Sequence, residues 1–278
     1  MRIILCGDFR QTEIQTVARE VNRLLSRQGA ETCYAVPYSL RRTTDRVLPK
    51  GAKWRTLKSV LGCAEMMISI GTPDLLVRTA GMAMLKKAPF LGISTGERHA
   101  LATLDASALP ELKQLAEGHY TVEQCMALMV SVCREGEMVF CRHAVCDAVF
   151  AKRWVPHVLH VTVRADEKVL WNLSGDGLIV ASPLGSAGYS LVAGGPIVDH
   201  TAESIAVTPI CSHDLCTKPI ILDAGRKVSV LQKENREVPM RLIVDGTVSF
   251  PLQKKDQVII QASEYCLSKV RMEHTLFF

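Results

Sequence analysis

The chain has 278 residues, of which 48% are hydrophobic and 22% charged, and its formal net charge is +5. These values predict a globular protein with a substantial core, built as one large domain or two modest ones, and they exclude a small module. The positive charge is mild and dispersed, whereas a nucleic-acid-binding protein more often carries a basic cluster on one element.

The basic side chains between residues 41 and 58 come nearest to such a cluster. Polar and apolar residues interrupt them, so we interpret this stretch as a solvated face. No segment approaches the roughly 20 apolar residues that span a bilayer, and residues 1–8 turn polar too soon for a signal peptide. Ten cysteines without a secretion signal indicate reduced thiols. We therefore expect a cytoplasmic protein that binds neither nucleic acid nor membrane.

The first third of the chain alternates strand and helix patterns. The predicted strands cover Arg2–Cys6, Cys33–Val36, Met66–Ile70 and Phe90–Ile93. Helices are predicted after Thr12-Glu13-Ile14-Gln15, which resembles a capping box, and over Leu75–Lys86. Such alternation is typical of a parallel sheet covered by helices. The loops around Gly71 and Gly92 then emerge at the edge where open α/β sheets bind ligands.

Beyond about residue 106 strand patterns dominate, after a short predicted helix over Leu109–Gly118. The strands cover Thr121–Val132, Val158–Arg164, Lys168–Leu173 and Gly177–Ala181. Hydrophobic residues alternate on both sides of Asp245-Gly246, which predicts a hairpin, because Asp-Gly suits a tight primed turn. We expect an α/β domain with a mostly parallel sheet over residues 1–106 and an antiparallel β-rich domain over residues 107–265. The pattern leaves open whether residues 266–278 return to the first domain.

Residues 175–196 carry the clearest chemical pattern, a buried strand followed by a loop of small residues. Small residues let a backbone approach a ligand closely, and Ser186 or Ser190 can present donors at a helix start. Asp176, between two glycines, suits a ribose hydroxyl or an adenine amine, and Tyr189 offers a flat face. An ordinary glycine-rich strand-to-helix turn is the alternative that composition leaves open.

Histidine and cysteine residues give weaker signals. Two spacings suggest a metal, Cys141-x-His143-x-x-Cys146 and Cys211-x-His213-x-x-Cys216, but neither contains a Cys-x-x-Cys knuckle, so we expect no structural zinc. His99 lies beside Glu97 and Arg98. The pattern leaves open whether His99 titrates in a binding site or is a solvated loop residue.

The run SGDGLIVASPLGSAGYSLVAGGPIV, Ser174–Val198, resembles the signature of the NAD kinase family in order and spacing. Further matches are Thr208-Pro209-Ile210-Cys211-x-His213, Lys218-Pro219 and Val244-Asp245-Gly246. The resemblance covers essentially the whole chain and implies an N-terminal α/β domain, a C-terminal β domain and a site in the cleft between them. It also implies phosphorylation of the 2′-hydroxyl of the adenosine ribose of NAD, from ATP or polyphosphate, with a divalent metal. Members of the family are commonly dimers or tetramers.

Carried over residue by residue, the resemblance implies nucleotide-binding and catalytic positions in this chain. The nucleotide-binding positions are Gly71, Cys146, Asp147, Asp176, Gly185, Ser186, Ala187, Gly188, Tyr189 and Asp245. Thr72 stands where the family has the aspartate that accepts the hydroxyl proton. Asp74 lies two residues further on and could replace that aspartate only in a rearranged loop.

The sequence departs from the family at several of these positions. The Gly-Gly-Asp-Gly loop reads Ile70-Gly71-Thr72-Pro73 here, and threonine cannot act as a general base at neutral pH. Ala100 replaces an aromatic residue and Cys146 replaces an asparagine. Leu184 and Ala187 replace two threonines, whose polar contacts are each worth about 0.5–1.5 kcal/mol. We therefore expect NAD kinase activity that is weak or altered.

Three functions stay open at this stage. The first is a divergent NAD kinase that uses ATP and Mg²⁺. The second is a non-catalytic, regulatory protein that binds NAD(P) or another adenine nucleotide. The third is a kinase of a different hydroxylated substrate, its pocket reshaped by the substitutions. In each case we expect a homodimer or homotetramer.

Overall fold

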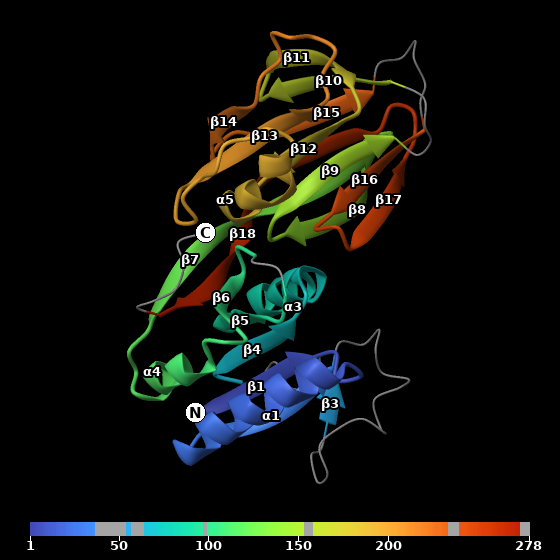
Figure 1. The fold of residues 1–278 in the computed structure, drawn as a ribbon. Coiled ribbons are helices and arrows are strands. Elements are labelled where there is room, and N and C mark those ends of the chain that lie inside the picture. The colour runs from blue at the N-terminus through green and yellow to red at the C-terminus, as the bar shows by residue number, and fades with distance from the viewer. Residues whose placement is uncertain (37–53, 57–63, 97–98, 153–157, 233–238, 273–278) are drawn as a thin grey trace. The chain divides into compact units, whose positions relative to one another are not determined.

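The computed structural model describes residues 1–36, 54–56, 64–96, 99–152, 158–232 and 239–272. Most of the basic stretch of residues 41–58, together with Glu97 and Arg98, lies outside the described residues. The chain divides into two compact units (Figure 1). The first contains residues 1–124 and the chain from Leu267 onward, and the second contains Cys125–Cys266.

The first unit is built around a parallel sheet with the strand order β3-β2-β1-β4-β5, and β6 pairs with β5. Its strands are β1 (Arg2–Gly7), β2 (Glu31–Val36), β3 (Trp54–Thr56), β4 (Met66–Gly71), β5 (Phe90–Ser94) and β6 (Ala102–Asp105). Its helical elements are α1 (Thr12–Arg27), α3 (Pro73–Leu85), a 3₁₀ turn (Leu109–Glu111) and α4 (Leu112–Ala116). This is the predicted alternation of strands and helices.

Helices α1 and α3 cover opposite faces of this sheet. Successive residues of a strand point to opposite sides, so two neighbouring residues of β4 show which helix covers each face. Ile68 belongs to the buried cluster that contains the α1 residue Val21. Its neighbour Ser69 points the other way and shares a hydrogen bond with Thr79 of α3, with 2.7 Å between the hydroxyl oxygens. Both faces of β4 are therefore buried, as its continuous hydrophobic run indicates.

The start of α1 differs from the prediction. The helix begins at Thr12 itself, and the residue before it, Gln11, makes no side-chain cap. The Gln15 side chain donates to the Phe9 carbonyl at 2.8 Å instead of closing a capping box. The predicted helix over 109–118 is also shorter, since it consists of a 3₁₀ turn followed by a single short α-helix.

The second unit is almost entirely antiparallel. Its strands are β7 (Thr121–Arg134), whose first residues belong to the first unit, β8 (Glu137–Ala144), β9 (Asp147–Lys152), β10 (Leu159–Ala165), β11 (Lys168–Gly175), β12 (Gly177–Ala181), β13 (Ser204–Ile210), β14 (Ile220–Asp223), β15 (Val228–Gln232), β16 (Met240–Val244), β17 (Val248–Leu252) and β18 (Gln257–Arg271). One sheet has the order β14-β13-β12-β9-β16-β17, and β11, β10, β15 and β18 follow one another in a second. β7 pairs with β18 and with β8.

The core of the second unit lies between these two sheets. Val180 of β12 and Val161 of β10 share one buried cluster. The alternate residues Ile179 and Ala181 point to the other face of the six-stranded sheet, where Ala193 packs against them. The segment after β12 therefore covers that face. It contains a one-turn helix, α5 (Pro183–Gly185), and a π-type turn (Ser186–Ser190).

The architecture confirms the predicted fold class, an α/β unit with a mostly parallel sheet and an antiparallel β-rich unit. The hairpin around Asp245-Gly246 is also confirmed, since β16 pairs with β17 and both turn residues have positive φ. None of the helices in the described part of the chain has the length and hydrophobicity that crossing a membrane requires.

Candidate functional site

Most of the predicted site residues lie where three strand ends of the six-stranded sheet meet: the start of β9 and the ends of β12 and β16. This place is called the Asp147 edge of the sheet. β9 lies between β12 and β16 and is antiparallel to both. Asp147, at the start of β9, therefore pairs with Ala181 at the end of β12, and Ala148 pairs with Val244 at the end of β16. The residues before β9 and the loops after β12 and β16 consequently meet at this edge.

Asp245 holds these loops together through its side chain. Its Oδ1 accepts the backbone N–H groups of Cys146 at 2.8 Å and Asp147 at 3.1 Å. Its Oδ2 accepts the N–H group of Val145 at 2.8 Å. Asp245 itself has a left-handed conformation, with φ 51°, in the hairpin turn between β16 and β17. The predicted ligand-binding residue is thus, in this unit, the anchor of the segment before β9.

Gly185 sits directly on the backbone of Cys146. A Cβ atom at this position would lie 2.0 Å from the Cys146 carbonyl oxygen, so only glycine fits. The Ser182 hydroxyl fixes the same approach, because it donates to the Val145 carbonyl at 2.6 Å and accepts the Gly185 N–H at 3.2 Å. The small residues of this loop therefore serve close packing between two backbone segments.

The following turn separates buried from accessible side chains. Ser186 is fully buried, and its hydroxyl donates to the Pro183 carbonyl at 2.7 Å and accepts the Val198 N–H at 2.9 Å. Tyr189 is 48% exposed, so its ring is available to a partner. Ala187 and Gly188, between them, are half-buried. The position of Ser186 is that of a scaffold residue, whereas Tyr189 can contact a ligand.

Asp176 lies at the other end of β12. It precedes Gly177, which pairs with Ala151, whereas Ser182 follows Ala181 at the edge described above. The six steps from Asp176 to Ser182 correspond to about 20 Å of extended chain. The Asp176 carboxylate accepts a hydrogen bond from the Lys152 ammonium group at 2.6 Å. This hydrogen bond lowers the pKa of Asp176 below its usual range. The structure thus does not bring Asp176 together with Ser186 and Tyr189 in one copy of the chain.

Lys152 was not predicted from sequence as the partner of Asp176. The two residues are far apart in the chain and become neighbours only because β9 and β12 are paired.

The electrostatics of the Asp147 edge are unusual. Burial raises the pKa of the Asp147 carboxyl to about 7, and the neighbouring charge of Asp245 contributes to the rise. Burial also raises the pKa of Asp245, although its three backbone donors oppose the rise. Burial, with both carboxylates nearby, raises the pKa of the Cys146 thiol well above its ordinary value. Cys146 is therefore a neutral thiol at physiological pH.

The predicted catalytic loop belongs to the first unit, where it joins β4 to α3. Gly71 has φ 152°, and a Cβ there would lie 2.7 Å from the Leu75 side chain. Thr72 is exposed and occupies the N-cap of α3 without a side-chain cap, and Pro73 is the first helical residue. Asp74 is exposed in the first turn of the helix. The helix follows Thr72 directly, so the loop is a tight strand-to-helix turn.

His99 lies in the loop after β5 and is partly buried rather than solvated. Its Nδ1 accepts the Leu101 N–H at 3.2 Å, which leaves the proton of the neutral ring on Nε2. Burial and then the charge of Lys269 lower the pKa of His99, while the charge of Asp74 opposes them. His99 is therefore neutral near pH 7 and offers an Nε2–H donor.

Lys269, at 3% exposure, was not predicted from the sequence. A lysine in an alternating strand normally indicates an exposed position, and only the pairing of β18 with β5 places it here.

Metal-ligating side chains do not gather in the described residues, where no group of three or more His, Cys, Asp or Glu could hold an ion. Neither Cys-x-His-x-x-Cys spacing brings its three side chains together as such a group in that part of the chain. His143 instead contacts the Ser263 hydroxyl at 2.8 Å, and the His213 backbone N–H donates to the Ser174 carbonyl at 2.9 Å.

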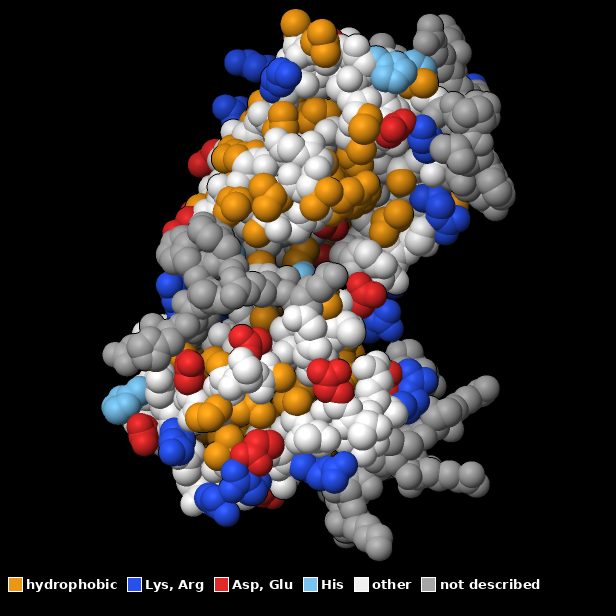
Figure 2. Space-filling model, in the orientation of Figure 1, with side chains coloured by type: hydrophobic (Ala, Val, Ile, Leu, Met, Phe, Trp, Pro, Cys, Tyr) orange, Lys and Arg blue, Asp and Glu red, His pale blue; other side chains and the backbone are white. Residues whose placement is uncertain are grey.

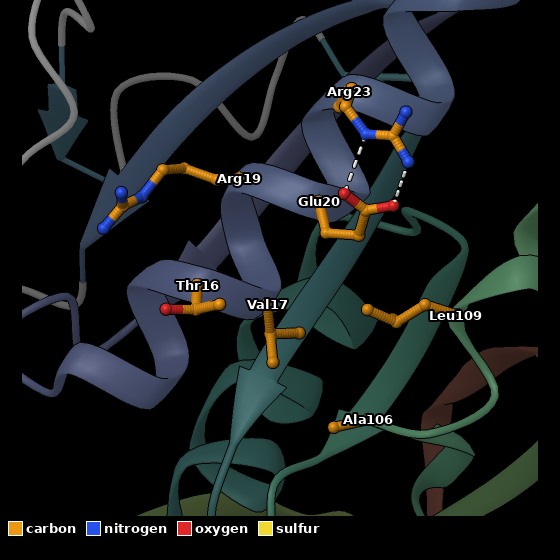
Figure 3. Close-up of a pocket in the computed structure, with 7 residues that line it drawn as sticks. All are labelled: Thr16, Val17, Arg19, Glu20, Arg23, Ala106 and Leu109. Atoms are coloured by element: carbon orange, nitrogen blue, oxygen red, sulfur yellow. Dashed lines mark hydrogen bonds and ion pairs between the residues drawn. The ribbon is translucent and has the colours of Figure 1, made fainter.

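The first unit also has a groove of about 450 Å³ beside α1 (Figure 3). Its lining residues are Thr16, Val17, Arg19, Glu20, Arg23, Ala106 and Leu109. The most polar part of the lining is occupied by an ion pair, in which Arg23 Nε donates to Glu20 at 2.8 Å (Figure 3). None of the predicted site residues lines this groove.

Comparison with known proteins places this geometry in a family. Residues 147–272 match the model of the ATP-NAD kinase C-terminal domain. The chain is 33% identical over 216 residues to an NAD kinase from Natranaerobius thermophilus, which covers 77% of this chain and 75% of that protein. It is also 33% identical over 236 residues to an NAD kinase from Symbiobacterium thermophilum, covering 84% of this chain and 80% of that protein.

The chain belongs to the NAD kinase family.

Solved structures of NAD kinases and NADH kinases share the fold. Yeast NADH kinase complexed with NADH superposes with a TM-score of 0.78 at 17% identity, covering 98% of this chain and 83% of that one. The NAD kinase from Archaeoglobus fulgidus in complex with ATP gives a TM-score of 0.72 at 20% identity, covering 98% and 94%. The segment that matches the NAD kinase family model begins at Asp147 and contains Gly185, Tyr189 and Asp245.

Proposed function

We propose that this protein binds NAD or a related adenine nucleotide and phosphorylates the 2′-hydroxyl of the adenosine ribose, using ATP, at a low rate. The observation that carries the proposal is the Asp147–Gly185–Asp245 edge of the second unit. It lies in the segment matched to the family. Backbone hydrogen bonds hold its parts together, since Asp245 accepts the Cys146 N–H and Ser182 accepts the Gly185 N–H. Two relatives of the same fold were solved with NADH and with ATP, which supports a nucleotide as the ligand.

The low rate is inferred from Thr72. Its hydroxyl cannot accept a proton at neutral pH, and general-base assistance typically contributes about 10²–10⁴-fold. Phosphoryl transfer depends mainly on positioning and charge neutralisation, so a slower reaction can persist without the base. Mg²⁺ would act on the ATP phosphates, which usually supply several of its ligands together with water. A dedicated set of protein ligands is therefore not required.

A non-catalytic nucleotide-binding protein is the second candidate, and the exposed, uncapped Thr72 favours it. Asp74 lies in the first turn of α3, so taking over the role of the missing carboxylate would require the helix start to unwind. In this reading the second unit binds NAD(P) or another adenine nucleotide and the first unit supplies no base. A kinase acting on another hydroxylated compound is a variant of the first proposal and enters the same assay as an added substrate.

Assembly and location are part of the proposal. Hydrophobic side chains gather on the face of the second unit around α5 and β13 (Figure 2), and Val192 and Leu215 of this unit are both 83% exposed. Such exposure supports a homodimer or homotetramer. None of the nine cysteines among the described residues forms a disulfide, which supports a cytoplasmic location.

The test combines turnover with binding. Purified protein is incubated with NAD, ATP and Mg²⁺, and NADP is measured by an enzyme-coupled assay, while calorimetry measures the binding of NAD and ATP separately. Binding with slow NADP formation supports the proposal, and binding without any NADP supports the second candidate. An absence of binding at millimolar nucleotide contradicts both.

A further inference from the structure

The two carboxyl groups at the edge of the six-stranded sheet have unequal surroundings. Asp245 accepts three backbone N–H groups, from Val145, Cys146 and Asp147, at 2.8 to 3.1 Å. Such donors stabilise an ionised carboxylate strongly, because each N–H dipole points at the negative charge. The negative charge of the pair is therefore held on Asp245.

Asp147 has no comparable support. Among the described residues none donates a hydrogen bond to its side chain, which is partly buried at the start of β9. The titratable groups that face it are Asp245, from the β16–β17 turn, and the neutral thiol of Cys146. The turn after β12, Ser182 to Gly185, contributes no charged side chain. No cation in the described part of the chain thus offsets a second negative charge at Asp147.

A carboxyl group in this position keeps its proton most easily. Removing the proton would place a second, unsupported charge beside Asp245 in a poorly solvated site. Burial and the Asp245 charge accordingly raise the pKa of Asp147 to about 7, so the protonated form dominates in mildly acidic solution and the two forms are similar in amount near neutrality.

We propose that Asp147 is the protonated member of the Asp147–Asp245 pair and donates a hydrogen bond to an acceptor atom of the bound adenine nucleotide, so that binding weakens when the proton is lost. This inference rests on the proposed function and extends it to the regulation of the same site by pH. A neutral carboxyl can donate, whereas the ionised form only accepts and repels the nucleotide phosphates. The site would thus bind the nucleotide more tightly in mildly acidic solution than in mildly alkaline solution.

The experiment measures NAD binding by calorimetry at about pH 6, 7 and 8. NAD is the probe because its diphosphate has no group that titrates in this interval. If only the protonated form donates, the dissociation constant of the unmodified protein rises about tenfold between about pH 6 and 8. In Asp147→Asn, whose amide remains a donor at every pH, the constant stays flat. Glu203→Gln, which removes an exposed carboxylate in the same unit, is the matched control and keeps the dependence of the unmodified protein.

A second measurement separates failure of the inference from failure of the proposed function. Carbon-13 NMR of labelled aspartate follows the Asp147 carboxyl in the free protein, assigned by its loss in Asp147→Asn. A midpoint near 7 supports the protonated state, and a midpoint near 4 overturns the inference whether or not NAD binds. Binding of NAD that is independent of pH also overturns it, while leaving the proposed function intact. If NAD does not bind at any pH, the proposed function fails and the donation step fails with it.

Discussion

Asp147 and Asp245 are joined by two hydrogen bonds of opposite direction, one to the Asp245 side chain and one between the backbones. The Asp147 N–H donates to Asp245 Oδ1 at 3.1 Å, and the Asp245 N–H donates to the Asp147 carbonyl at 2.9 Å. The hairpin turn is thereby fixed to the start of the central strand β9. The charge of Asp245 also raises the pKa of the Asp147 carboxyl.

Replacing Asp245 by alanine is expected to destabilise the protein. The change leaves three backbone N–H groups at a partly buried edge without their acceptor. A loss of about 3 kcal/mol in the free energy of unfolding is expected. Urea denaturation measures it. Asp245→Asn, which retains one acceptor oxygen, should lose less, and equal losses in the two variants would contradict the role assigned to the carboxylate.

Asp147 is expected to make stability depend on pH. Its folded-state pKa of about 7 exceeds the ordinary value of 3.8, so its contribution to stability is full below about pH 4 and is lost as pH rises through about 7. Asp147→Asn should therefore stabilise the protein by roughly 2–4 kcal/mol at about pH 8 and much less at about pH 4. Denaturation of both proteins at the two pH values tests this sign, and a constant difference would contradict it.

Restoring a carboxylate at Thr72 is expected to raise NAD kinase turnover by about 10²–10⁴-fold, if the other groups are in place. Thr72 is the exposed N-cap of α3, where aspartate is a preferred residue, so Thr72→Asp should fold normally. Thr72→Asn is the control, since it has a similar shape without a proton acceptor. An equal rate in both variants would show that the carboxylate does not act as the base.

The neighbouring positions of this loop are better left unchanged in that experiment. Ile70 is fully buried in the core around α1, and its replacement by glycine would remove a large side chain at a cost of several kcal/mol. Pro73 begins α3 and suits the first helical position. The single substitution therefore separates chemistry from folding more cleanly than a restoration of the whole loop.

Gly185→Ala is expected to be severely destabilising, by more than about 2 kcal/mol, because its Cβ would lie 2.0 Å from the Cys146 carbonyl oxygen. Gly96→Ala is the matched control, as no atom lies within 4 Å of the added methyl group there. Thermal denaturation compares the two. Equal melting temperatures would mean that the loop after β12 can move away from Cys146 without cost.

Asp176→Asn is expected to change stability by less than about 1 kcal/mol, because the Asp176 side chain of its ion pair with Lys152 is 46% exposed to solvent. If Asp176 contacts the nucleotide, the variant loses about 1–3 kcal/mol of binding free energy, measured by calorimetry with NAD. Lys152→Met is the companion variant. A drop in melting temperature with unchanged affinity would assign Asp176 to the scaffold.

The sequence predicted those parts of the fold that depend on local pattern. The Asp245-Gly246 hairpin and the strand and helix on either side of Gly71 follow from short-range signals, and the structure contains them. The prediction of a capping box at Thr12 is wrong, since the helix includes Thr12 and the Gln15 side chain donates a hydrogen bond to the Phe9 carbonyl. Local residue type alone could not distinguish these two arrangements.

The candidate site was less predictable, because it depends on which strands are neighbours. Asp176 and Ser186 lie ten positions apart in one motif, but strand β12 runs between them, so they lie beyond opposite ends of that strand. Asp147 and Asp245 are far apart in sequence, yet the pairing of β9 with β16 makes them neighbours. Their unequal hydrogen bonding depends on the same pairing and has no sequence signal.

The course of β18 limits how this protein can be divided into fragments. Its first residues pair with β15 in the second unit, and from Leu267 it belongs to the first unit, where Lys269 pairs with Phe90. A recombinant piece ending at Gln124 would lack Val270 and Met272, which are buried in the core around α1. Expression of the first unit alone would therefore require grafting Leu267–Met272 onto it as a separate peptide or through a permuted chain.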